Sequence, residues 1–212
     1  KNAGLQLRAQ IDRLTALYKL SAQLTSTLDI DLIFQVVCEN VGSIVPYGEF
    51  RIDLFDASSR MKSPAFHMRV VNGERIVTPQ VLQPVAIQPE SPEWYVFSSK
   101  RSYRAPGGTS FHVPMLSKEA IMGIMSISSA GGGEYTDAQA RVLESVANLT
   151  AIALEKGKLY EETIRFSMEI QQRNKELDDF TYVVSHDLKE PLISVEGFSR
   201  ILQSDYSQVI QP

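Results

Sequence analysis

The stretch SFHVPMLSKEAIMGIMSIS, residues 110–128, consists of two apolar runs joined by a short polar segment. Apolar runs of this length that are bounded by polar turns are typical of β-strands, and the short connection predicts a β-hairpin. Three glycines, Gly131–Gly133, then end the strand pattern. We therefore expect residues 110–116 and 120–128 to be neighbouring antiparallel strands of one sheet.

After the glycines the sequence changes to a helical pattern. Thr136 can cap a first turn, and apolar residues then recur at spacings of three and four. Between Thr136 and Pro191 the only residue that disfavours a helix is Gly157. We therefore predict one long helix that leaves the sheet without a flexible linker. The apolar stripe of its first part is Val142, Leu143, Val146, Leu149, Ile152 and Ala153.

Two more helices are predicted ahead of the sheet. Residues 5–28 have apolar side chains at heptad-like spacing and contain no proline, which predicts an amphipathic helix. Asp29 or Asp31 can cap a second helix over residues 30–44. The stripe of the first helix consists of Leu7, Ile11, Leu14, Leu17, Tyr18, Leu20, Leu24 and Leu28.

Strand patterns lie between the second helix and the hairpin. Residues 50–55 and 65–71 are predicted strands, and the second ends at Asn72-Gly73, a strong turn dipeptide. A proline-containing segment of irregular strand and loop follows. Residues 92–97 fit a short helix with a proline in its first turn, and residues 102–104 fit a brief strand.

This order of elements predicts an α+β fold, in which an antiparallel sheet flanked by helices continues into a long C-terminal coiled-coil helix. We divide the chain into an N-terminal amphipathic helix, residues 1–29, a globular domain, residues 30–155, and a C-terminal helical part, residues 156–212. The sequence begins and stops inside helical patterns, so we expect it to be a piece of a longer protein.

Composition narrows the class of protein. The 212 residues are 43% hydrophobic and 22% charged, which is ordinary for a globular chain. The net charge of −4 gives no electrostatic reason to expect nucleic acid or an anionic membrane as partner. The single cysteine, Cys38, excludes an intramolecular disulfide and a cysteine-based zinc site, and we expect no bound metal. No apolar run approaches the roughly 20 residues that span a bilayer. We expect a cytoplasmic chain whose parent protein can carry a membrane anchor upstream.

Residues 30–155 resemble a GAF domain. The resemblance rests on an ordered series: an apolar strand with a proline, Phe111–Leu116, a strand with a glycine, Ile121–Ile127, an aromatic-Thr-acid helix start, Tyr135–Asp137, and the Ala-Ile-Ala-Leu run of residues 151–154. GAF domains bind small molecules, among them cyclic nucleotides, bilins and haem. The resemblance therefore implies a sensor domain, and the identity of its ligand stays open.

Aromatic residues in the middle of this domain are the candidate ligand contacts, although packing in the core is the alternative interpretation of most of them. His112 and His67 lie on predicted strands and can face a cavity. A covalent bilin needs a cysteine in the pocket, and Cys38 lies on the early helix instead. The candidates are Trp94, Tyr95, Phe97, Tyr103 and His112.

The stretch FTYVVSHDLKEPL, residues 180–192, carries a second motif. Its apolar residues occupy one helical face, and His186 falls off that face, so the imidazole should point at solvent. Pro191 removes a main-chain donor and predicts a bend one turn after the histidine. The string resembles the phosphoacceptor box of bacterial sensor histidine kinases, on the first helix of a HisKA-type dimerisation domain.

That resemblance implies an enzyme that passes a phosphoryl group from ATP, with Mg²⁺, to His186 and then to an aspartate of a response-regulator receiver domain. Asp187 takes the role of the acid that orients the histidine. Glu190 stands where members with strong regulator-phosphatase activity carry Thr or Asn, which puts that activity in doubt. The ATP-binding domain is absent from these 212 residues, so we expect the fragment to be inactive alone and to hold no cofactor of its own.

Two heptad series along the long helix predict a parallel coiled coil, and with it a homodimer through the N-terminal and C-terminal helices. Lys156, Thr163 and Arg173 interrupt the seam. The alternative function is a non-catalytic GAF module that binds a ligand or dimerises, with a degenerate phosphoacceptor box. The first series is Leu149, Lys156, Thr163, Ile170, Leu177 and Val184, and the second is Ile152, Leu159, Phe166, Arg173, Phe180 and Asp187.

Overall fold

The computed structural model describes residues 2–56, 58–78, 83–118 and 120–205, with side chains from residue 14 onward. The chain divides into two compact units, residues 1–160 and 161–212. All strands found in the described residues belong to the first unit, and the described part of the second unit is helical. The domain limits expected at residues 29 and 155 stay a prediction.

An antiparallel sheet forms the centre of the first unit. In the described residues it has seven strands in the order β3-β2-β1-β7-β6-β5, with β4 also paired to β2. The predicted α+β fold with an antiparallel sheet is confirmed, and residues 110–128 form its hairpin of β6 and β7. The strands are β1 Glu49–Asp56, β2 Met61–Val71, β3 Glu74–Val77, β4 Val85–Ala86, β5 Tyr103–Arg104, β6 Ser110–Ser117 and β7 Ala120–Ser128.

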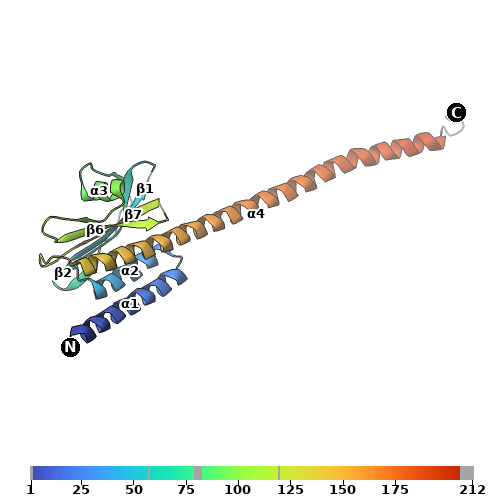
Figure 1. The fold of residues 1–212 in the computed structure, drawn as a ribbon. Coiled ribbons are helices and arrows are strands. Elements are labelled where there is room, and N and C mark those ends of the chain that lie inside the picture. Colours follow the sequence, from blue (N-terminus) through green and yellow to red (C-terminus); the bar gives the residue numbers. More distant parts are fainter. Residues whose placement is uncertain (1, 57, 79–82, 119, 206–212) are drawn as a thin grey trace. The chain divides into compact units, whose positions relative to one another are not determined.

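Helices cover both faces of this sheet. Figure 1 shows α1 (Asn2–Ser26), α2 (Ile30–Ile44) and the first part of α4 (Asp137–Asp205) on one face, which we call the inner face. The short helix α3 (Pro92–Ser99) lies on the opposite, outer face. The outer face is therefore only partly covered, and this difference positions the candidate site.

Local signals in the sequence explain where the helices begin. Asp29 accepts hydrogen bonds from two main-chain N–H groups of α2, and Ser91 accepts one in α3, where Pro92 follows it. Thr136 and Gln139 form a capping box, in which each side chain accepts a hydrogen bond from the main-chain N–H of the other residue, at 3.3 and 2.9 Å. The predicted caps at Asp29 and Thr136 are confirmed.

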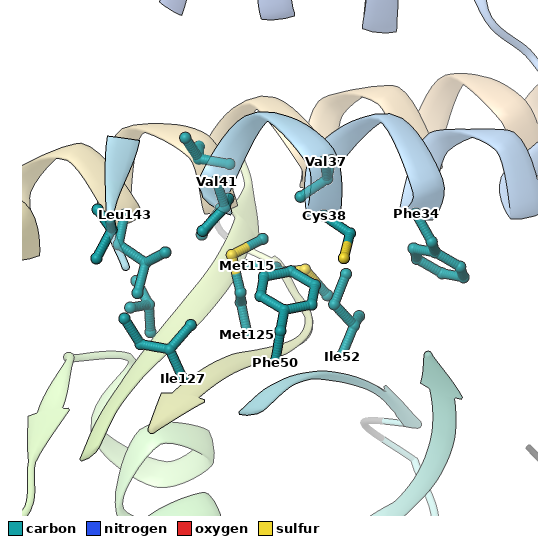
Figure 2. Packing of buried hydrophobic residues seen from close by; sticks show 14 of the residues in the cluster. Phe34, Val37, Cys38, Val41, Phe50, Ile52, Met115, Met125, Ile127 and Leu143 are labelled. Atoms are coloured by element: carbon teal, nitrogen blue, oxygen red, sulfur yellow. The ribbon is translucent and has the colours of Figure 1, made fainter. Parts of the chain in front are cut away.

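The main core fills the space between the inner face and the three helices (Figure 2). Phe34 and Val37 of α2 meet Phe50 and Ile52 of β1, and Leu143 of α4 packs beside them. These side chains are at most 2% exposed, and burying an aliphatic or aromatic side chain of this kind stabilises the fold by roughly 1.5–3 kcal/mol. The core thus holds α2 and α4 against the sheet.

A bulge in β2 changes which side chains reach the outer face. The pairing of β1 with β2 shifts between Ile52 and Asp53, whose partners are Phe66 and Pro64, so Ala65 is the extra residue. On one side of the bulge the odd-numbered His67 faces outward, and on the other side the even-numbered Lys62 does. A shift of one residue turns every later side chain to the opposite face. The bulge therefore brings Lys62 to the outer face.

The helix α1 contacts the domain through one side and exposes another. Leu20 and Leu24 are buried in the main core, whereas Leu14 and Tyr18 are 62% and 76% exposed. Leu7 and Ile11 of the predicted stripe lie outside the described side chains. The helix therefore packs on its own domain, and it also has an apolar surface that the described chain does not cover.

The helix α4 is the single long helix that the sequence predicts, and it runs through Pro191 without ending. The predicted bend at Pro191 stays a prediction. In the described part of the chain no helix combines the length and the apolarity that a membrane crossing requires. Many apolar side chains of α4 in the second unit are more than half exposed, among them Phe166, Ile170, Leu177, Phe180, Leu188, Leu192, Val195, Phe198, Ile201 and Leu202.

Candidate functional site

The outer face of the sheet contains a small polar cavity of about 110 Å³, which would hold the volume of three or four water molecules. It lies beside the central strands, in the part of the face that α3 leaves open. Side chains with hydrogen-bonding groups make up most of its wall. The lining residues are Glu49, Arg51, Ser110, His112, Ser126, Ile127 and Ser128.

His112 is the one sequence-predicted ligand residue that lines this cavity. Its Nδ1 lies 2.9 Å from the hydroxyl of Ser126 and its Nε2 lies 3.3 Å from that of Ser110, while the ring of Tyr103 packs against it at 5.9 Å between centroids. Burial lowers the pKa of His112 to about 4, although the carboxylate of Glu93 opposes that shift. The imidazole is therefore neutral at pH 7 and acts as a hydrogen-bonding group.

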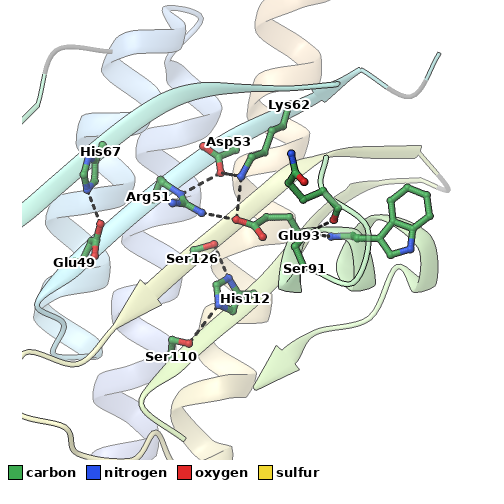
Figure 3. A network of polar contacts seen from close by, with 12 residues as sticks. Glu49, Arg51, Asp53, Lys62, His67, Ser91, Glu93, Ser110, His112 and Ser126 are labelled. Carbon is green, nitrogen blue, oxygen red and sulfur yellow. Dashed lines mark hydrogen bonds and ion pairs between the residues drawn. The ribbon is translucent and has the colours of Figure 1, made fainter. Parts of the chain in front are cut away.

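Four charged side chains lie beside the cavity and form what we call the ion ring: Arg51, Asp53, Lys62 and Glu93 (Figure 3). Oε1 of Glu93 lies 2.7 Å from Nη2 of Arg51 and 2.9 Å from Nζ of Lys62. Oδ2 of Asp53 lies 3.1 Å from Nε of Arg51 and 3.6 Å from the same Nζ. Both cations thus contact both carboxylates, and the ring has no net charge.

The four members of the ion ring come from three elements, β1, β2 and α3. Arg51 and Asp53 occupy alternate positions of β1 and point to the same face, and the bulge in β2 brings Lys62 to them. Glu93 comes from the first turn of α3, next to the cap formed by Ser91. An acidic residue is favoured there by the helix dipole. Glu93 therefore joins α3 to the sheet.

The carboxylate of Glu93 is ionised under all ordinary conditions. Burial alone would raise its pKa, but the hydrogen bond from Lys62 and the charges of Lys62 and Arg51 outweigh burial and lower the pKa to about 2. Asp53 is even less accessible, at 1% exposure, and among the described residues its Oδ2 receives no hydrogen bond of good geometry. Removing any single charge from the ion ring would leave an uncompensated charge in a poorly hydrated place.

The other predicted ligand residues pack around α3 and do not line the cavity. Trp94 and Phe97 join an apolar cluster under α3, and Tyr95 packs on Tyr103 with 43% of its surface exposed. Only Tyr103 approaches the site, through the ring of His112. Their placement agrees with the alternative interpretation given above, that most of these residues are packed in a core.

The cavity in this structure is smaller than a tetrapyrrole. Its volume is far below that of a haem or bilin, and Cys38 lies in the inner-face core, where its thiol contacts the hydroxyl of Tyr47 at 3.3 Å. His67 faces outward but bonds the carboxylate of Glu49 at 2.7 Å. No cluster of three or more His, Cys, Asp or Glu that could hold a metal ion occurs within the described residues.

The second candidate site lies in the helical unit at His186. Its side chain is 60% exposed, Nδ1 lies 3.4 Å from Oδ1 of Asp187, and Nε2 lies 4.0 Å from Oε1 of Glu190. Phe180 on the apolar side of the helix is 64% exposed. Exposure therefore does not distinguish the helix face that carries His186 from the apolar face. The specific feature of this site is the pair of carboxylates, Asp187 and Glu190, beside the imidazole.

None of the four members of the ion ring was identified from the sequence. A signal was present for Arg51 and Asp53, because Glu49, Arg51 and Asp53 are charged residues that alternate with the apolar Phe50, Ile52 and Leu54. Nothing in the local sequence indicates that Lys62 and Glu93 belong to this site, because the bulge in β2 positions Lys62 and the packing of α3 on the sheet positions Glu93.

Three comparisons place the chain among known proteins. A model of the GAF domain matches residues 47–155, which is just over half of the chain. The chain is 25% identical over 236 residues to the methanogenesis regulatory histidine kinase FilI of Methanothrix harundinacea, covering 98% of this chain and 26% of that protein. It is 38% identical over 68 residues to cyanobacterial phytochrome B of Nostoc, covering 32% of this chain and 9% of that protein.

The fold has counterparts among solved structures. The GAF domain of a two-component sensor histidine kinase from Bacillus halodurans superposes with a TM-score of 0.52 at 12% identity, over 64% of this chain and 99% of that one. At this identity the likeness concerns the fold alone. The chain spans only about a quarter, or less, of the two longer relatives named above.

Proposed function

Because the chain belongs to the GAF domain family, we propose that it is the sensory and phosphoacceptor part of a histidine kinase of a two-component system. In this proposal the outer-face cavity binds a small molecule, and the ligand state of the GAF domain controls phosphorylation of His186. The observation that carries the proposal is the combination on one chain of a GAF fold and, further along α4, a histidine flanked by acids within the string SHDLKEPL.

The relatives support a signalling role. The similarity to a histidine kinase extends over 98% of this chain, so it includes the helical part around His186 as well as the GAF domain. A phytochrome, which is a second sensor protein, is similar over a shorter stretch. The activity of the whole protein, its ATP-binding domain and its response-regulator partner are parts of the proposal.

The geometry at His186 supports a chemical role for both nitrogens. When Asp187 accepts a hydrogen bond from Nδ1–H, the lone pair resides on Nε2. Nε2 then attacks the terminal phosphorus of ATP, a P–N bond forms, and the bond to the leaving ADP oxygen breaks, while Nδ1 keeps its proton. When an oxygen of the regulator aspartate takes the group, the P–N bond breaks and the neutral imidazole with its Nδ1–H is released. Asp187 is thus a positioning residue for the nucleophile.

Exposed apolar surfaces support a homodimer as the working form. Leu14 and Tyr18 on α1 and Ile152 and Leu159 on α4 are each more than half exposed. They agree with the heptad spacing of a parallel coiled coil, in which a second copy of the chain would cover them. Such a pairing would also cover the apolar side chains of the second unit.

Phosphorylation in trans tests the proposal. The chain is incubated with ATP, Mg²⁺ and the separately purified ATP-binding domain of a sensor histidine kinase, and acid-labile phosphate on the chain is measured. We expect label on the wild-type chain and on His67→Gln, and none on His186→Gln. Equal labelling of His186→Gln, or no label on the wild type with several such domains, would leave a GAF module that binds ligand or dimerises without phosphotransfer.

A further inference from the structure

Within the ion ring, Arg51 and Lys62 bind the carboxylate of Glu93, a residue of the protein itself. Two cations from adjacent strands, Arg51 and Lys62, converge on a single oxygen of Glu93 at 2.7 and 2.9 Å. Charge-assisted hydrogen bonds from arginine and lysine are among the strongest contacts by which proteins bind carboxylates. The carboxylate here is supplied by an eight-residue helix that lies on the outer face, next to an open polar cavity.

We propose that the outer-face cavity binds a small monocarboxylic acid, whose carboxylate replaces that of Glu93 at Arg51 and Lys62 and thereby releases the first turn of α3 from the sheet. This inference rests on the proposed function, because it names the chemical class of the ligand that the sensor domain takes. It also names the first movement that the ligand causes.

Charge selects the class of ligand. Without Glu93, the two cations and the carboxylate of Asp53 leave a net charge of +1 in a place where Asp53 is 1% exposed and Lys62 is 19% exposed. A single negative charge restores neutrality, whereas a dianion such as a phosphate would leave an excess negative charge. His112 is held neutral and adds no charge, and the carboxylate of Glu49, which also lines the cavity, faces Arg69 at 3.8 Å and His67 at 2.7 Å.

The cavity selects the remainder of the ligand. Its volume of about 110 Å³ accommodates a few non-hydrogen atoms beside the carboxylate, and the cavity opens to solvent. The hydroxyls of Ser110, Ser126 and Ser128 and the imidazole of His112 line it, and Glu49 offers an acceptor. These groups fit a short acid that carries a hydroxyl substituent better than a purely hydrocarbon acid.

The residue that follows Glu93 provides a direct readout. Trp94 is the only tryptophan of the sequence, and its ring packs on Phe97 in the cluster beneath α3. Loss of the Glu93 contacts would change the surroundings of Trp94, so its fluorescence reports on the first turn of α3. The competition also has a measurable consequence, because an internal competitor lowers the apparent affinity of the ligand that replaces it.

The test compares the wild-type chain with Glu93→Gln, Lys62→Gln and the control Glu90→Gln, which changes an exposed carboxylate three residues away. Sodium acetate, sodium lactate and sodium glycolate are titrated at constant ionic strength against acetamide and sodium chloride, with Trp94 fluorescence and the midpoint of thermal unfolding as readouts. We expect at least one carboxylate to bind Glu93→Gln at least about tenfold more tightly than the wild type. Binding should disappear in Lys62→Gln and match the wild type in Glu90→Gln.

The proposal is overturned if Glu93→Gln binds none of the three carboxylates, binds them no more tightly than the wild type, or responds equally to acetamide. The ion ring would then be a structural clamp only. If Glu93→Gln folds only when acetate is present, that rescue supports the proposal. If it folds in neither condition, the comparison of the wild type with Lys62→Gln tests the proposal. A carboxylate that changes Trp94 fluorescence in the wild type but not in Lys62→Gln supports the proposal, and no such difference overturns it. Labelling of His186 is measured separately, so either proposal can fail without the other.

Discussion

The side-chain amine of Lys156 in α4 donates a hydrogen bond to the main-chain carbonyl of Thr25 in the last turn of α1. The last carbonyls of a helix have no partner within the helix, and a lysine there satisfies one of them. The heptad pattern had suggested that Lys156 only interrupts a coiled-coil seam. In the structure the same residue joins the end of α1 to α4.

Replacing Lys156 with Met should weaken this junction. The carbonyl of Thr25 loses its partner, so the free energy of unfolding should fall by about 1 kcal/mol and the last turn of α1 should exchange its amide hydrogens faster. Urea unfolding and hydrogen exchange measure the two effects, and Lys175→Met, an exposed lysine later in α4, serves as the control. Equal behaviour of the two variants would mean that water replaces the amine without cost.

Replacing Gly157 with Ala should destabilise the domain, although alanine normally favours a helix by about 1 kcal/mol over glycine. A Cβ at this position would lie 2.9 Å from the main-chain oxygen of Leu28, where the connection from α1 to α2 crosses α4. Gly197 in the same helix meets nothing within 4 Å, so Gly197→Ala is the matched control and should raise helicity. Circular dichroism during thermal unfolding measures both, and a higher midpoint for Gly157→Ala would contradict the close approach.

The stability of the domain should depend on pH through His112. Its pKa is about 4 in the folded state and near 6.5 in the unfolded chain, so below pH 6.5 the unfolded chain takes up the proton first. The contribution is complete above pH 6.5 and is lost as the pH falls toward 4, by about 2–3 kcal/mol. Charged groups from three elements face this ring: Arg51, Lys62 and Glu93.

His112→Gln keeps a hydrogen-bonding side chain but does not titrate in this range. The urea midpoint of that variant should vary less between pH 6.5 and 4 than that of the wild type, whereas His67→Gln should follow the wild type more closely. Parallel pH profiles of the wild type and His112→Gln would show that the imidazole is hydrated and not held neutral by burial.

Replacing Asp53 with Asn should be costly. The change removes one negative charge from the ion ring and leaves a net charge of +1 beside a side chain that is 1% exposed. Breaking a buried ion pair from one side typically costs about 3–5 kcal/mol. Chemical denaturation measures the loss, and Glu74→Gln on the exposed strand β3 is the control, expected to change stability by less than about 0.5 kcal/mol. A loss below about 1 kcal/mol for Asp53→Asn would indicate that solvent screens the ring.

Much of the fold follows from local signals in the sequence. Asn72-Gly73 closes the hairpin of β2 and β3 with positive φ at both residues, as this dipeptide predicts. Asp29 and Thr136 cap the helices that they were expected to begin. Each of these features depends on a few neighbouring residues, and that is why the sequence alone predicts them.

The candidate site was less predictable because it depends on contacts between distant segments. Lys62 reaches the outer face only because Ala65 is an extra residue in β2, and nothing in the local pattern indicates that bulge. In the sequence Glu93 is an ordinary acidic residue at the start of a helix. Its contact with Lys62, which is 31 residues away along the chain, exists only because α3 packs on the sheet. The aromatic residues that the sequence suggested as ligand contacts instead pack around α3 in the structure.

Phosphotransfer to His186 is tested most directly by identifying which residue of the chain carries the phosphate. After phosphorylation in trans, the chain is digested at neutral pH and the peptides are sequenced by mass spectrometry under conditions that preserve phosphohistidine. We expect phosphate on His186 alone, lost in acid and stable in base. Phosphate on His67 or His112, or acid-stable phosphate on a serine or threonine, would contradict it.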